Sequence, residues 1–136
     1  MPTSTGRYNE NLRTEVRHSR SGSSFVTDAP VDNNGKGEAF SPTDLVAAAL
    51  GSCMATIMGI WAEKNDVDLS GLHWEITKHM SSNTPRRIVA IDVHMEWPGA
   101  HTATDEQKHK LKKAALTCPV AQSLHPDIQQ NISFNF

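Results

Sequence analysis

The sequence predicts an α+β fold in one domain of 136 residues, and three patterns support that prediction. An uncharged run from Leu45 to Ala62 is long enough for a central helix. Two later segments, residues 72–78 and 86–97, alternate apolar and polar residues as half-buried strands do. Strands that come in pairs around helices, in the order ββαββααβ, favour α+β over a wound parallel sheet.

The first forty residues are predicted to form a hairpin and a loop. Residues 11–20 and 23–28 have strand composition and flank a Ser-Gly turn. Residues 29–40 are rich in Pro, Asn and Gly, which is typical of a loop. We expect residues 1–10 to be a poorly ordered N-terminal segment.

The central helix begins with the capping chemistry of soluble proteins. Ser41 is a good N-cap, Pro42 suits the first helical position, and Asp44 can close a capping box. The uncharged run also reaches the length of a membrane span. We reject a membrane span because the run is rich in alanine, contains Ser52 and Thr56, and has no flanking Lys or Arg cluster. A helix that is apolar all round is otherwise buried, most easily with cover from a second subunit.

Two helices and a strand complete the chain. Thr104 opens a charged helix with a T-x-x-Q capping box. A shorter helix is predicted to begin at Cys118-Pro119 and to run to about His125. The final residues, NISFNF, alternate and predict a last strand.

Composition limits the classes of function. The formal net charge is -2 and the basic residues are scattered, so no nucleic-acid surface is indicated. The N-terminus does not resemble a signal peptide, and we therefore expect a cytoplasmic protein whose two cysteines rest as thiols. No C-x-x-C pair and no His/Cys spacing typical of zinc sites is present, so no metal is expected.

The two cysteines have different local chemistry. Cys53 lies in the apolar helix, where a cysteine usually serves as a small hydrophobic residue. Cys118 stands at a predicted helix start, where free N–H groups favour a thiolate, so local chemistry alone makes it the more acidic thiol. The two could form a redox pair if the fold brings them together.

The stretches around the two cysteines, SPTDLVAAALGSCMATIM and TCPVAQSL, resemble the two cysteine motifs of the OsmC/Ohr family. The approach to the first, DAPVDNNGKGEAFSP, also resembles OsmC-like proteins, and the resemblance extends from about Asn11 to Phe136. It implies an OsmC-like domain over residues 1–136 that intertwines with a second copy. In such a homodimer the sheets pack around two long central helices, and the active sites lie at the interface.

The resemblance implies a cysteine-based peroxidase that acts in oxidative-stress defence. Cys53 would be the nucleophile and Cys118 the resolving cysteine. Arg20, or Arg17 if the register slips, would favour the thiolate and orient the peroxide. Organic hydroperoxides are the expected substrates, with hydrogen peroxide as a further candidate. The expected reductant is an external dithiol such as a lipoyl protein, and no metal or flavin cofactor is needed.

One position departs from the Ohr pattern. Thr43 stands where Ohr-type members carry a glutamate, and Glu38 or Asp44 could supply the supporting carboxylate. This departure keeps a second function open, in which the dimer binds a small molecule or senses redox state without efficient peroxidase activity. The apolar substrate pocket is expected to be lined by Leu50, Met54, Ile57 and Trp61.

Overall fold

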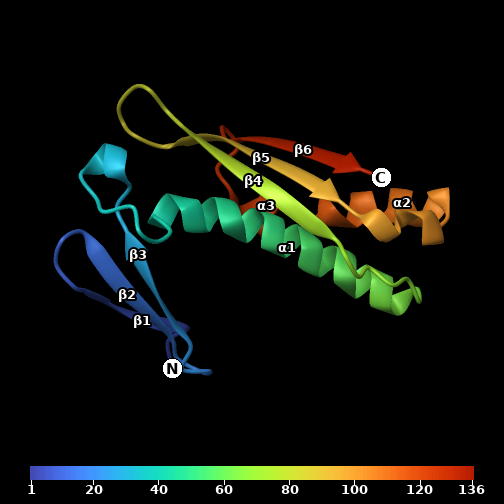
Figure 1. Cartoon of the computed structure of the whole chain (residues 1–136), viewed down its shortest axis with the longest axis horizontal. Helices are drawn as coiled ribbons and strands as arrows, with labels where there is room; N and C mark the ends of the chain where they lie inside the picture. The colour runs from blue at the N-terminus through green and yellow to red at the C-terminus, as the bar shows by residue number, and fades with distance from the viewer. The chain divides into compact units, whose positions relative to one another are not determined.

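Figure 1 shows the computed structural model of the whole chain, residues 1–136, which folds as two compact units. The first unit comprises residues 1–46 and the second residues 47–136. Each unit contains one three-stranded sheet, and the helices complete an α+β fold. The fold class predicted from the sequence is therefore confirmed.

The sheet of the first unit has the strand order β1-β2-β3 and is antiparallel throughout. Strands β2 (Arg13–His18) and β3 (Ser24–Asp28) form the predicted hairpin, and Gly22 in its turn has a φ of 75°, which favours glycine. Strand β1 (Ser4–Tyr8) lies in the segment that we expected to be poorly ordered. All five of its residues are exposed, so no alternation of polarity indicated a strand. A short 3-10 helix, η1 (Val31–Asn33), follows β3.

Helix α1 (Pro42–Lys64) begins with the predicted capping box. The Asp44 N–H donates to Ser41 Oγ at 3.1 Å, and the Ser41 N–H donates to Asp44 Oδ2 at 3.0 Å. The apolar helix is a core helix, as predicted, because one of its faces is buried inside the chain. That face consists of Ala47, Leu50, Gly51, Met54, Met58 and Ala62.

The sheet of the second unit combines two pairing modes. Strands β4 (His73–Met80) and β5 (Ile88–Glu96) are the predicted hairpin and pair antiparallel. Strand β6 (Gln129–Asn135) confirms the predicted last strand and pairs parallel with β5. A parallel pair needs a long crossover, because the chain must return to the starting edge of the sheet.

The crossover from β5 to β6 contains the remaining helices. A 3-10 helix, η2 (Pro98–Thr102), precedes α2 (Asp105–Ala115). The predicted capping box of α2 is present, with the Gln107 N–H donating to Thr104 Oγ1 at 3.1 Å. Helix α3 (Pro119–Ser123) begins where the sequence predicts but ends earlier than His125.

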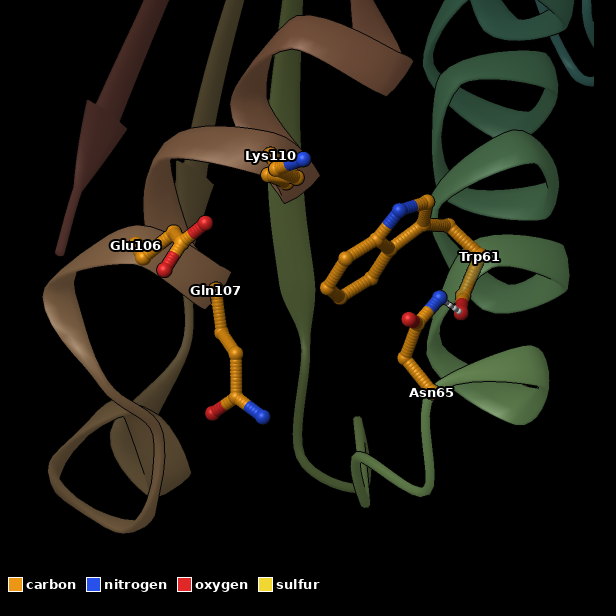
Figure 2. Close-up of a pocket in the computed structure, with 5 residues that line it drawn as sticks. All are labelled: Trp61, Asn65, Glu106, Gln107 and Lys110. Atoms are coloured by element: carbon orange, nitrogen blue, oxygen red, sulfur yellow. Dashed lines mark hydrogen bonds between the residues drawn. The ribbon is translucent and has the colours of Figure 1, made fainter.

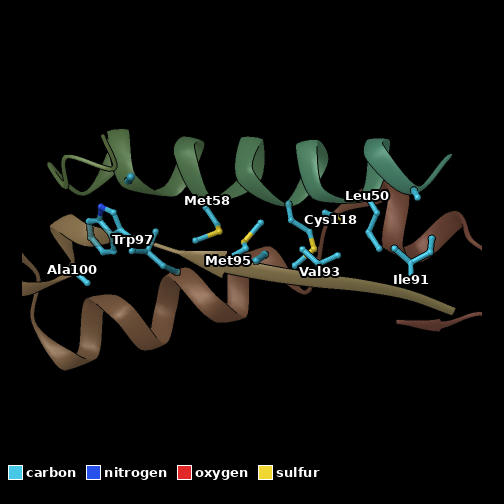
Figure 3. Packing of buried hydrophobic residues seen from close by; sticks show 13 residues of the cluster. Leu50, Met58, Ile91, Val93, Met95, Trp97, Ala100 and Cys118 are labelled. Atoms are coloured by element: carbon cyan, nitrogen blue, oxygen red, sulfur yellow. The ribbon is translucent and has the colours of Figure 1, made fainter. Parts of the chain in front are cut away.

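The apolar core of the second unit lies between α1, α2 and the inner face of the sheet. Figure 3 shows Leu50 and Met58 of α1 on one side of this core and Ile91, Val93 and Met95 of β5 on the other. The same core contains Cys118, which is buried. The core therefore positions the second cysteine of the chain beneath the helix that carries the first.

Candidate active site

Cys53 lies in the middle of α1, at the edge of the buried face. Leu50 and Met54 beside it are fully buried, whereas Cys53 is partly exposed. The reason is helical geometry, since consecutive residues differ by about 100° around the axis. Cys53 is not in a disulfide, and its partial exposure is compatible with reaction at the thiol.

Cys118 is fully buried and is the N-cap of α3. Its backbone is extended, with φ -61° and ψ 142°, and Pro119 occupies the first helical position. Its Sγ accepts a hydrogen bond from the Ala121 N–H at 3.3 Å, and its own N–H donates to the Ala115 carbonyl at 3.3 Å. The end of α2 and the start of α3 therefore hold this sulfur in the core.

The structure places the two predicted cysteines near each other, since Cys53 packs against the apolar core that contains Cys118 and affects the pKa of that thiol. Burial raises the pKa of Cys118, the Ala121 N–H lowers it, and the neighbouring Cys53 thiol raises it again, for a net increase. Local chemistry alone suggested an acidic Cys118. The helix start does act in that direction, but burial outweighs it.

The four side chains expected to line an apolar pocket lie along α1. Leu50 and Met54 are fully buried in the core, and Ile57 and Trp61 are partly buried and pack against it. Leu50 and Met54 flank Cys53 along the helix, so apolar atoms surround the inner side of this thiol. Trp61 lies two turns further along, at the other end of α1.

Trp61 takes part in a different cavity, of about 230 Å³. Figure 2 shows its indole directed from α1 toward α2, with the Asn65 side-chain amide donating to the Trp61 carbonyl at 2.8 Å. The remaining lining is polar and comes from α2. This cavity is lined by Trp61, Asn65, Glu106, Gln107 and Lys110.

The two arginines proposed from the sequence are both exposed. Arg20 lies in the turn after β2, and Arg17 lies in β2 with its guanidinium beside Gly22. Both belong to the first unit, whereas the two cysteines belong to the second. Their roles at the thiols stay predictions.

A third arginine, Arg13, makes the strongest ion pair of the first unit. Its Nε and Nη2 each lie 2.7 Å from an oxygen of Asp28, which is buried. The hydrogen bond from Arg13 lowers the pKa of Asp28, although burial acts against it. Sequence reasoning missed this pair, yet the hairpin register predicts it, because pairing Arg17 with Ser24 aligns Arg13 with Asp28.

Glu38 and Asp44, the two carboxylates proposed to support an arginine, make different contacts in the structure. Glu38 Oε2 lies 3.5 Å from Arg13 Nη2, and the Glu38 N–H donates to Asp28 Oδ2 at 3.1 Å. Asp44 closes the capping box of α1. Thr43, at the position of the Ohr glutamate, has its Oγ1 3.2 Å from Ser41 Oγ.

The structure contains no group of three His, Cys, Asp or Glu side chains placed to hold a metal ion. The reactive groups identified at this site are its two thiols, of which Cys53 is partly exposed and Cys118 is buried, and Cys53 affects the pKa of Cys118. Such a pair can form a reversible disulfide.

Solved structures share this architecture. A protein of Psychrobacter arcticus 273-4, proposed to be an osmotic stress induced and detoxification response protein, is 44% identical, with a TM-score of 0.93 over 99% of this chain and 96% of that one. The organic hydroperoxide resistance protein OsmC of Legionella pneumophila has the same fold at 14% identity, with a TM-score of 0.76 over 100% of this chain and 98% of that one.

An OsmC-like protein of unknown function from Vibrio cholerae shares the fold too, at 14% identity and a TM-score of 0.75, over 97% of this chain and 99% of that one. No curated protein sequence matched the chain. The sequence profile of OsmC, described as OsmC-like protein, matches residues 35–133. The chain therefore belongs to the OsmC-like protein family.

Proposed function

We propose that this protein is a cytoplasmic thiol peroxidase that reduces organic hydroperoxides. The observation that supports it most directly is that a partly exposed cysteine, Cys53, packs against the core that contains a buried one, Cys118. The detoxification response proposed for the Psychrobacter arcticus relative agrees with this function. So does the organic hydroperoxide resistance of the more distant Legionella pneumophila protein.

Cys53 is the nucleophile in this proposal, because it is the thiol that a peroxide can reach. Its thiolate attacks the terminal oxygen of the hydroperoxide. An S–O bond forms, the O–O bond breaks, and the departing alkoxide takes up a proton to become an alcohol. Cys53 is thereby oxidised to a sulfenic acid. The apolar side chains of Leu50 and Met54 beside it favour an alkyl substrate over hydrogen peroxide.

Cys118 completes the cycle as the resolving residue. Its sulfur attacks the sulfenic sulfur of Cys53, an S–S bond forms, and the hydroxyl leaves with the Cys118 proton as water. An external dithiol, such as a lipoyl protein, then reduces the disulfide by thiol exchange and is itself oxidised to a disulfide. The attack falls on Cys53, because Cys118 is fully buried.

An arginine supplies positive charge to the thiolate and to the departing oxygen in this proposal. Arg20 is the first candidate and Arg17 the second, and both are exposed. Arg13 is a third candidate. Its Nη2 lies 3.5 Å from Oε2 of Glu38, which was proposed as a supporting carboxylate. Single alanine variants of the three arginines separate them, since only the active-site arginine should slow the first oxidation of Cys53 in a stopped-flow measurement.

A homodimer forms part of the proposal. The first unit exposes the side chains of Tyr8 (63%), Phe25 (49%) and Phe40 (57%), and α1 exposes Ile60 (46%). Obligate dimers bury apolar surface of this kind, in interfaces that exceed roughly 2,000 Å². Sedimentation equilibrium at micromolar concentration should show a dimer, and a folded monomer there would contradict this part of the proposal.

Thr43 favours a second candidate function, a dimer that binds a small molecule or senses redox state. Its hydroxyl lies beside Ser41 Oγ and, unlike a glutamate, carries no charge to hold a guanidinium. Such a protein would form the same disulfide without efficient turnover. The rate of peroxide consumption therefore separates the two functions.

The experiment is a peroxide-consumption assay with dithiothreitol or dihydrolipoamide as reductant. We expect multiple turnovers with cumene hydroperoxide and slower turnover with hydrogen peroxide. Cys53→Ser should abolish turnover, and Cys118→Ser should allow one stoichiometric oxidation. No turnover in a protein that still forms the disulfide would reject the peroxidase and favour the sensor.

A further inference from the structure

The cavity beside Trp61 has a lining that the proposed peroxidase does not use. It measures about 230 Å³ and lies within the second unit, between the end of α1 and the start of α2. Because an α-helix rises 1.5 Å per residue, Trp61 lies about 12 Å further along α1 than Cys53. One acidic, one basic and two amide side chains line the cavity with the indole, so it does not suit an alkyl hydroperoxide.

The two charged side chains of the cavity are available to a ligand. Glu106 and Lys110 have the i,i+4 spacing on α2 at which opposite charges often pair. Neither forms an ion pair within the chain, and both are exposed. Figure 2 shows Lys110 on the α2 side of the cavity, opposite the Trp61 indole. A carboxylate and an ammonium group therefore line one cavity without neutralising each other.

The two amide side chains are held in place, and one half of each amide is left for a ligand. The Asn65 Nδ2 group donates to the Trp61 carbonyl at 2.8 Å, which leaves Asn65 Oδ1 as an acceptor. Gln107 Oε1 accepts the Thr104 N–H at 2.9 Å, which leaves Gln107 Nε2 as a donor. The cavity therefore offers a neutral acceptor as well as a carboxylate, and a neutral donor as well as an ammonium group.

We propose that this cavity binds a small zwitterion, a molecule with one ammonium and one carboxylate group on a short apolar frame, such as an α-amino acid. Lys110 and the Gln107 Nε2 group bind its carboxylate. Glu106 and the Asn65 Oδ1 atom bind its ammonium group, and the Trp61 indole packs against its apolar part. The mechanism of the proposed peroxidase uses none of these side chains, so the two proposals are independent.

The volume of the cavity limits the size of the ligand. Because a cavity of about 150 Å³ holds benzene, one of this volume holds roughly nine non-hydrogen atoms. L-Leucine has about this size and carries both charges. It is therefore a suitable probe, and isocaproate and isoamylamine are matched analogues that lack its ammonium group and its carboxylate, respectively.

The test is a titration of isotope-labelled protein with L-leucine at neutral pH, in which NMR follows the indole N–H signals of the three tryptophans. The Trp61 signal, assigned with Trp61→Phe, should move with a dissociation constant of about 1 mM, as expected for so small a ligand. The signal of Trp97, which is buried, is the internal control and should not move. Isocaproate and isoamylamine should each bind about fivefold more weakly, since one exposed charge pair is lost.

Two variants assign the charges to their side chains. Lys110→Gln should weaken the binding of leucine and isocaproate about fivefold and leave that of isoamylamine unchanged. Glu106→Gln should weaken the binding of leucine and isoamylamine by a similar factor and leave that of isocaproate unchanged. Lys113→Gln is the matched control, because Lys113 is exposed on α2 and does not line the cavity, and it should bind all three ligands as the wild type does.

Three results would overturn the proposal. The first is a Trp61 signal that leucine does not move, or that all three ligands move with equal affinity. The second is equal weakening of all three ligands in both variants, which a change of structure would cause. The third is a Trp61 signal that moves with protein concentration but not with leucine, which would show that a second copy of the chain fills the cavity.

Discussion

The two units of the chain are stabilised by different forces. The buried apolar cluster, from Ala47 to Cys118, belongs entirely to residues 47–136. In residues 1–46 the buried side chains are polar, namely Thr27, Asp28 and Ser41. Apolar burial stabilises the second unit, whereas hydrogen bonds and ion pairs stabilise the first. A three-stranded sheet without an apolar core of its own is marginal alone, which agrees with the homodimer proposed above.

The largest effect should come from the core of the second unit. Leu50 is fully buried, and Leu50→Ala should lower the free energy of unfolding by about 2–5 kcal/mol through lost burial and a cavity. Leu116→Ala is the matched control, because Leu116 is 50% exposed and should cost less than about 0.5 kcal/mol. Urea unfolding measures both, and equal losses would contradict the placement of the core.

Gly51 and Gly59 of α1 provide a further test of which side of this helix faces the core. A Cβ at Gly51 would lie 2.6 Å from Trp74 Nε1 and 2.8 Å from Ile76 Cδ1, so Gly51→Ala should cost about 1–3 kcal/mol. A Cβ at Gly59 meets no atom within 4 Å. Any loss caused by Gly59→Ala should therefore depend on protein concentration, because only a second copy could crowd that position. A concentration-independent loss equal to that of Gly51→Ala would contradict this account.

A smaller, local effect is expected in the first unit. Asp28→Asn weakens the paired hydrogen bonds to Arg13 and the bond from the Glu38 N–H. Hydrogen exchange of residues 29–40 should become roughly tenfold faster, because charge-assisted bonds of this kind are about twice as strong as neutral ones. Glu15→Gln, in the exposed pair with Arg7, is the control and should change little. Faster exchange across β4 and β5 instead would show that the ion pair does not act locally.

The two units should respond to opposite ends of the pH scale. The lowered pKa of Asp28 stabilises the first unit above its ordinary value of 3.8, and this stabilisation is lost as the pH falls below that value. The raised pKa of Cys118 acts in reverse, so the second unit is stable below pH 9.0 and loses stability as the pH rises above it. Hydrogen exchange measured at low and at high pH checks both directions. Asp28→Asn should remove the loss of stability of the first unit at low pH, and Cys118→Ser should remove that of the second unit at high pH.

Patterns of polarity and capping residues were enough to predict most of the fold. The Ser41 and Thr104 capping boxes and the alternation in β4 and β5 locate their elements correctly. Strand β1 has no buried side, so its sequence carries no alternation to find. The parallel pairing of β6 with β5 depends on how the crossover packs, which local sequence does not specify.

The candidate site was predictable only in part, and its prediction came from the family resemblance rather than from patterns of polarity. The family resemblance pointed to Cys53 and Cys118, and in the structure Cys53 packs against the core that contains Cys118; their roles stay predictions. Local reasoning alone misjudged Cys118, because its acidity depends on burial by residues that are distant in sequence. The Arg13–Asp28 pair was missed because charged residues far apart in sequence become neighbours only once the hairpin register is fixed.

The central claim is that the two thiols act in sequence on a peroxide. Its most direct test is peptide mapping by mass spectrometry after one equivalent of cumene hydroperoxide without reductant. The wild type should contain an intrachain Cys53–Cys118 disulfide, and Cys118→Ser should contain a dimedone-trapped sulfenic acid at Cys53. Oxidation of Cys118 at the full rate in Cys53→Ser, or crosslinks between chains only, would contradict the account.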